Sequence, residues 1–105
     1  QDLPIYTQLE GDIHYLKQDY NSALASYKKV NESNIRSAST IFTEAKTLEM
    51  LETPAEEVLV LMDSCVAQFN KPYSADAAPY LIERARVRVM QYSITMNVMQ
   101  RFLVT

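Results

Sequence analysis

Apolar residues recur along the chain at steps of three and four positions, the spacing of one face of an α-helix. Short stretches rich in Asn, Ser, Pro or Glu interrupt this pattern and divide the chain into segments. The pattern predicts five helices, over residues 3–18, 20–30, 37–51, 55–69 and 77–104. The composition agrees, because the 105 residues include one glycine, and all-β or loop-rich folds need glycine at their turns.

Several of the predicted helices have a start signal in the sequence, and Ser74 or Asp76 is the candidate cap of the last one. Asp2 precedes Leu3-Pro4, and Asp19 precedes the second segment, so both are candidate N-cap residues. Thr53-Pro-Ala-Glu56 combines a Thr cap with proline in the first turn and a Glu, as in a capping box. The helix that follows is apolar almost all round over Val58–Met62, which predicts cover on several sides and a place in the middle of the stack.

The last segment contains neither glycine nor proline from Tyr80 to Thr105. Its apolar stripe alternates steps of three and four: Ile82, Ala85, Val89, Tyr92, Met96, Met99 and Leu103. Residues 77–104 therefore form either one unbroken helix or a hairpin, and the pattern favours the unbroken helix. Such a helix cannot fold back on its own stack, so its stripe is available for a second copy of the chain. The other interpretation is that it forms the exposed end of a longer array.

Small residues also mark a repeat. Gly11 and Ala45 are 34 residues apart, and the run from Gly11 to Tyr20 ends in Asp-Tyr before Ala23 and Tyr27. This pattern resembles the tetratricopeptide repeat family, most specifically over residues 4–30. The sequence departs from the family at Thr7, Glu10 and His14, which stand where the family often has Trp, Leu and Tyr, and it lacks the proline after the second helix.

The resemblance implies an all-α fold, a right-handed superhelical stack of antiparallel helix pairs with about five helices, the last of them open to being one long helix. It implies a single domain over residues 1–105, with pairs over about 3–31, 37–70 and 76–105. Small side chains at Gly11 and Ala23 are expected to let two helices approach closely, with Tyr27 filling the gap to the next pair.

In this family the first helices of successive pairs line a concave groove. Carried over by position, the groove would comprise Ile5, Gln8, Asp12, Tyr15, Phe42, Lys46, Glu49, Ile82, Arg86 and Val89. The resemblance implies a non-catalytic scaffold that binds a peptide or protein segment there. The alternative is an assembly module that forms a homodimer through Met96, Met99, Phe102 and Leu103. Gln8, Asp12 and Thr43 replace the Lys and Asn with which chaperone-binding relatives hold a terminal carboxylate, so we expect no binding of acidic chaperone tails.

The remaining chemistry argues against an enzyme. Glu10 and His14 are four residues apart on one predicted helix, but two ligands make a poor metal site. Cys65 has no basic neighbour in the sequence, so we expect it to be a buried packing residue. We therefore expect no cofactor, metal or catalytic residue. The net charge of −3 disfavours nucleic acid as a partner. Arg84, Arg86 and Arg88 belong either to a solvated face or to an anchor for an acidic peptide.

The compartment stays open. No apolar run reaches the roughly 18 residues of a membrane span. Because the chain starts at Gln1 without Met, we expect a processed chain or an excised segment. Both a periplasmic or secreted location after signal cleavage and a cytoplasmic one agree with this start.

Overall fold

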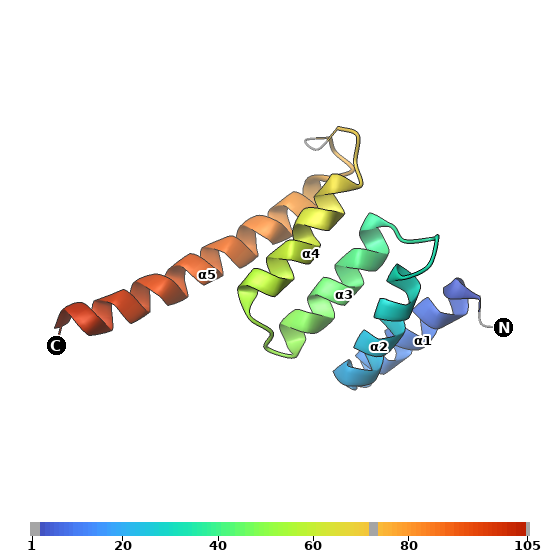
Figure 1. Ribbon diagram of the computed structural model, residues 1–105, viewed down its shortest axis with the longest axis horizontal. Coiled ribbons are helices and arrows are strands. Elements are labelled where there is room, and N and C mark those ends of the chain that lie inside the picture. Colours follow the sequence, from blue (N-terminus) through green and yellow to red (C-terminus); the bar gives the residue numbers. More distant parts are fainter. Residues whose placement is uncertain (1–2, 72–73, 105) are drawn as a thin grey trace.

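The computed structural model describes residues 3–71 and 74–104, and within these ranges it contains five α-helices and no strand. The helices are α1 (Pro4–Leu16), α2 (Tyr20–Asn31), α3 (Ala38–Met50), α4 (Ala55–Ala67) and α5 (Ala78–Val104). Each packs against the helix that precedes it, so the chain forms a row of neighbouring helices (Figure 1). The all-helical prediction is confirmed, with helix ends that differ by at most two residues from those expected.

The predicted start signals had different outcomes. Asp19 caps α2 by accepting a hydrogen bond from the Ser22 backbone N–H at 3.3 Å, as expected. The Thr53 cap was wrong: Pro54 occupies the N-cap position of α4, and no side chain caps that helix. Thr53 instead donates its N–H to the Leu48 carbonyl at 3.0 Å and so closes the end of α3. The Asp2 cap lies outside the described residues.

α1 and α3 end in the same way. Gln18 and Glu52 have φ of 64° and 59°, the left-handed conformation that follows many helices. After each, a backbone N–H returns to a carbonyl of the preceding turn, from Asp19 to His14 and from Thr53 to Leu48. The two left-handed residues are 34 positions apart in the sequence (52 − 18). The chain therefore reverses direction by one and the same motif after α1 and after α3.

Three small residues of the predicted repeat are buried between the helices. Gly11, Ala23 and Ala45 are all buried, as the sequence predicted. A Cβ built on Gly11 would lie 2.6 Å from Cε1 and 2.8 Å from Cδ1 of Tyr27, which is itself only 2% exposed. The absence of a side chain at Gly11 is therefore what lets the ring of Tyr27 pack directly on the backbone of α1.

The core is continuous from α3 through α4 to α5. One buried cluster joins Ala45 of α3, Val58 and Met62 of α4 and Val87 of α5. A second joins Ala38, Ile41 and Cys65, again across α3 and α4. α4 is thus covered on two sides, although the side chain of Val60 is exposed. The middle position expected for this helix agrees with its contacts to α3 and α5.

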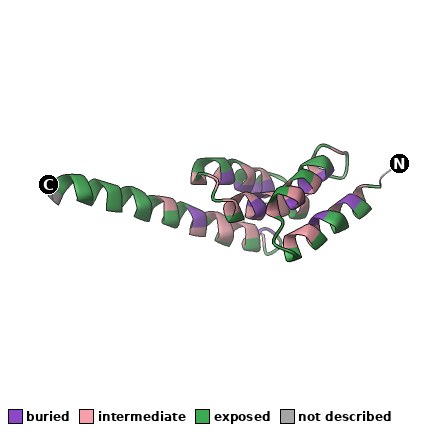
Figure 2. Cartoon of the chain, turned by 90° about the horizontal axis from the view of Figure 1, so that it is seen from below, coloured by how far each residue is buried: buried purple, intermediate pink, exposed green. Residues whose placement is uncertain are grey.

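Residues 78–104 form one helix of 27 residues without a turn, so the range 76–105 does not contain the third helix pair. The unbroken helix favoured by the sequence pattern is confirmed. Its first half packs on α4, and from Tyr92 to Leu103 every residue is exposed. Figure 2 shows this outer half projecting beyond the rest of the stack. Within the described ranges, no helix is both long enough and apolar enough to cross a membrane.

Candidate functional site

A pocket of about 250 Å³ opens between α1 and α3, with α2 behind it. The residues that line it are Asp12, Tyr15, Tyr27, Phe42, Thr43 and Lys46. Four of these, Asp12, Tyr15, Phe42 and Lys46, belong to the groove inferred from the sequence. The structure therefore brings together the central part of that groove. We call this hollow the α1/α3 pocket.

The back wall of the α1/α3 pocket is rigidly held. The Tyr27 hydroxyl donates a hydrogen bond to Oδ1 of Asp12 at 2.6 Å, which links α2 to α1. Burial, reinforced by this carboxylate, raises the pKa of Tyr27 well above its ordinary value. The phenol therefore stays protonated and Asp12 stays fixed at the rim. Tyr27 was predicted as a packing residue, and its place in the pocket wall was not foreseen.

Two aromatic rings form the sides of the pocket, and each is braced by a second ring. Tyr15 packs edge-to-face on Tyr20, with ring centroids 5.2 Å apart. Phe42 packs edge-to-face on Tyr80 of α5 at 5.3 Å, and Tyr80 in turn lies against Phe69 at 5.5 Å. Braced rings present apolar surface with little freedom to lose on binding. Tyr20 was noted in the sequence as part of the Asp-Tyr pair that resembles the repeat family, but the bracing role of Tyr20, Phe69 and Tyr80 was not predicted.

Beyond the pocket, α3 and α5 are joined by four charged side chains. The Lys46 ammonium lies 3.4 Å from Glu49 and 3.2 Å from Glu83. Nη2 of Arg86 lies 2.7 Å from both carboxylate oxygens of Glu49 and 3.0 Å from Glu83. The hydrogen bond from Arg86, aided by Lys46, lowers the pKa of Glu83, although burial acts in the opposite direction. This ion-pair cluster connects α3 to α5 next to the α1/α3 pocket, which Lys46 also lines.

All three arginines of α5 that were considered as an anchor pair with carboxylates of the chain itself. Arg84 and Arg88 both reach Oδ1 of Asp63, at 3.1 and 3.5 Å, while Arg86 points to the opposite side and joins Glu49. The shared face of Arg84 and Arg88 was expected from their spacing. With these pairs in place, the structure favours the solvated, ion-paired interpretation over an anchor for an acidic peptide.

The other residues of the expected groove are spread more widely. Gln8 donates to the Thr43 hydroxyl at 3.4 Å and so bridges α1 and α3 beside the pocket, with its own Oε1 buried. Ile5, Ile82 and Val89 are exposed and do not line the pocket. The expected groove is therefore assembled at its centre, where Gln8 and Thr43 connect α1 and α3, and not at Ile5, Ile82 and Val89.

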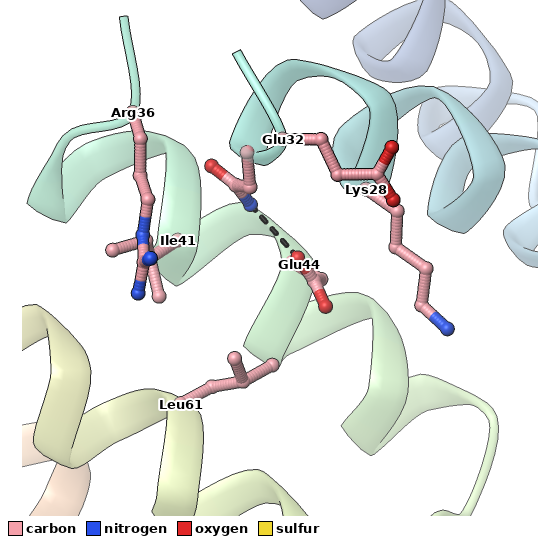
Figure 3. Close-up of a pocket in the computed structure, with 7 residues that line it drawn as sticks. Lys28, Glu32, Arg36, Ile41, Glu44 and Leu61 are labelled. Atoms are coloured by element: carbon pink, nitrogen blue, oxygen red, sulfur yellow. Dashed lines mark hydrogen bonds between the residues drawn. The ribbon is translucent and has the colours of Figure 1, made fainter. Parts of the chain in front are cut away.

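A second pocket, of about 290 Å³, lies between α2, α3 and α4. Its walls carry two basic and two acidic side chains beside two apolar ones, with Asn31 completing the lining: Lys28, Arg36, Glu32, Glu44, Ile41 and Leu61. The side-chain amide of Asn31 donates a hydrogen bond to Oε1 of Glu44 at 2.8 Å, and the six charged and apolar side chains are labelled in Figure 3. The charges balance, so this pocket does not select a ligand of either sign.

A third pocket, of about 390 Å³, opens where α5 leaves the α3–α4 turn. Its walls are mainly apolar and include Pro54, Val58, Val87, Met90 and Ile94. It lies on the side of α5 that faces the stack. It marks the point beyond which α5 has no neighbouring helix among the described residues.

The reactive or metal-ligating side chains considered in the sequence are Cys65, His14 and Glu10. Cys65 is buried, with its Sγ 3.4 Å from the Ala38 carbonyl oxygen, and burial raises the pKa of its thiol to about 12. His14 lies 3.7 Å from Asp19, and Glu10 is exposed. Within residues 3–71 and 74–104, no three His, Cys, Asp or Glu side chains are grouped so that they could hold a metal ion.

The four residues expected to support oligomerisation are all on the exposed half of α5. They are Met96, Met99, Phe102 and Leu103.

Comparison of the chain with protein-family models, with curated proteins and with solved structures found no match. The arguments on function therefore rest on the geometry of this chain.

Proposed function

We propose that the chain is a tetratricopeptide-like helical stack that binds a peptide or an extended protein segment in the α1/α3 pocket. The observation that carries the proposal is the pairing of two braced aromatic rings, Tyr15 and Phe42, across a pocket with charged groups at its rim. Aromatic side chains in such pockets supply much of the affinity of protein interfaces.

The repeat architecture is supported by two correspondences over 34 residues. Gly11 and Ala45 are both buried small residues of the first helix of their pair. Gln18 and Glu52 both end a helix in the left-handed conformation. Equivalent sterics at equivalent positions give α1–α2 and α3–α4 the same hairpin form, which is how solenoid proteins build an extended surface.

The size of the pocket indicates what enters it. Its volume of about 250 Å³ is below the roughly 300–1,000 Å³ of pockets that enclose cofactors and drug-sized ligands. It suits one large apolar side chain of a partner. Asp12 at one rim and Lys46 at the other offer an acceptor and a donor to the main chain of that partner, so the occupant is a neutral, amphipathic segment.

The test is selection of binders from a displayed library of random 12-residue peptides. We expect enriched peptides to carry a large apolar anchor and to lose at least about tenfold in affinity for Tyr15→Ala, a typical hot-spot effect. Tyr6→Ala is the matched control, because Tyr6 is 60% exposed on the same helix and does not line the pocket. Circular dichroism establishes that both variants fold.

Two results count against the proposal. One is a failure to enrich any peptide over an unrelated helical protein. The other is equal affinity of enriched peptides for the Tyr15→Ala and Tyr6→Ala variants, which would place binding elsewhere. Phe42→Leu is preferable to Phe42→Ala as a second probe, because Phe42 also packs against both buried clusters and its truncation would loosen the core.

A further inference from the structure

α5 has two opposite faces, and the stack uses one of them. Val87 is 3% exposed and belongs to the buried cluster with Ala45, Val58 and Met62. One turn later, the Gln91 amide donates to Glu56 of α4 at 3.1 Å. These residues define the side of α5 that faces the stack.

The apolar stripe of α5 lies on the other side. Its members are Ile82, Ala85, Val89, Tyr92, Met96, Met99 and Leu103, and all seven are exposed. At 100° per residue, every one of them lies within about 60° of the direction opposite Val87. The stripe therefore runs along the whole helix without a covering helix from the described part of the chain.

The spacing of the stripe is that of a coiled-coil seam. Steps of three and four give the period of 3.5 residues, with Ile82, Val89, Met96 and Leu103 at one core position of three heptads. Ala85, Tyr92 and Met99 occupy the other core position. A seam with this period becomes buried when a second helix supercoils along it. In contrast, the terminal helix of a repeat stack usually carries polar residues on the face that is exposed to solvent.

We propose that α5 pairs with α5 of a second copy of this chain, in antiparallel orientation, along this seam. Charge favours that orientation. Arg84, Arg86 and Arg88 lie on the inner half of α5, whereas Arg101 is the one charged residue between Tyr92 and Leu103. A parallel pair would bring the arginines of both copies to the same level, and an antiparallel pair places them beside the half of the other helix in which Arg101 is the one charged residue.

The residues that flank the seam agree with the antiparallel arrangement. When Val89 of one copy opposes Tyr92 of the other, Arg86 lies beside Ser93 and Arg88 beside Thr95 of the second copy. The projecting half of each α5 then covers the stack-bound half of the other. Since the two stacks lie on the outer faces and at opposite ends, they do not collide.

The area of the seam is sufficient for a stable dimer. Its members are between 38% and 81% exposed where a value is given, the extremes being Met96 and Leu103. With roughly 100 Å² from each of seven residues on each copy, the interface reaches about 1,400 Å², inside the range of specific protein–protein contacts. Phe102 lies at the flank of the seam and adds to its rim.

The first experiment measures mass by light scattering between about 1 and 100 µM, the range in which interfaces of this size associate. We expect the wild-type chain at twice its 12.0 kDa and Met96→Glu as a monomer. Val98→Glu is the matched control, because Val98 is also exposed and carries the same new charge on the side of α5 away from the seam. We expect it to remain a dimer.

The second experiment determines the orientation with single introduced cysteines under mild oxidation, since the buried Cys65 does not compete. Tyr92→Cys, near the two-fold axis, is expected to cross-link to itself. Leu103→Cys is not, because antiparallel pairing separates the two copies of this residue by more than about 25 Å.

Three results would overturn the proposal. A wild-type monomer at every concentration would remove the dimer. Equal loss of association in Met96→Glu and Val98→Glu would remove the seam. Efficient self-cross-linking of Leu103→Cys would show the parallel arrangement.

Discussion

Substitution of Gly11 by alanine sets two effects against each other. Within a helix, alanine is favoured over glycine by about 1 kcal/mol, so propensity alone predicts a more stable protein. In this structure the new Cβ would lie 2.6 Å from Cε1 of Tyr27, a distance that no packed side chain tolerates. The sign of the change in stability therefore tells which effect dominates.

The structure indicates that packing dominates. The Tyr27 ring is buried and its hydroxyl is tied to Asp12, so it cannot turn away without breaking that hydrogen bond. Overpacking costs about 1–3 kcal/mol, and a lost hydrogen bond to a charged acceptor adds about 1.5–3 kcal/mol. We expect the Tyr27 ring to shift only part of the way and to keep part of its hydrogen bond, so that neither cost applies in full. After subtraction of the gain in helix propensity, Gly11→Ala should lower the free energy of unfolding by about 1–3 kcal/mol.

Urea denaturation followed by circular dichroism measures the free energy of unfolding directly. Ala25→Gly, at an exposed site on α2, calibrates the propensity term in the same helix pair. In a Tyr27→Leu background the added methyl has room, so Gly11→Ala is expected to become neutral or stabilising there. Stabilisation of the single Gly11→Ala variant by about 1 kcal/mol would refute the close-contact reasoning.

Two further predictions concern a helix end and the ion-pair cluster. Ser37 and Thr40 form a capping box at the start of α3, whereas the Thr53 side chain does not cap α4. Ser37→Ala should therefore lower the free energy of unfolding in urea by about 1 kcal/mol, and Thr53→Ala should change it little. Equal losses in the two variants would contradict the assignment. The pKa of Glu83 is lowered in the folded state, so its stabilising effect is present above the ordinary value of 4.5 and is lost as pH falls through the folded pKa. Arg86→Met should accordingly lose less stability than the wild type between about pH 6 and pH 3, and an unchanged acid slope would count against this pairing.

Local sterics and periodicity were readable from the sequence. Gly11, Ala23 and Ala45 were assigned to close helix contacts because they occupy the small-residue positions of the family that the 34-residue spacing resembles. The residues at the centre of the expected groove came from the resemblance to the tetratricopeptide repeat family, in which the first helices of successive pairs line the groove. Its outer residues did not follow, because their position depends on how neighbouring helices splay apart, which no local pattern encodes.

Helix starts were less readable, for a physical reason. Thr53 has the right neighbours for a cap, but the left-handed turn at Glu52 draws its backbone into the closure of α3. Whether a residue caps the next helix thus depends on how the previous one ends. The covered face of α5 was equally difficult to predict, because apolar residues occur on two opposite faces of this helix and the buried Val87 lies outside the stripe.

Because Cys65 is buried, the rate at which its thiol reacts can be used to measure a local opening of the structure. It is the one cysteine of the chain, and its sulfur is enclosed between α3 and α4 with a pKa of about 12. A thiol reagent can reach it as a reactive thiolate only during moments when those two helices part. The rate of labelling under native conditions therefore reports the free energy of that one opening, separately from fraying elsewhere in the row.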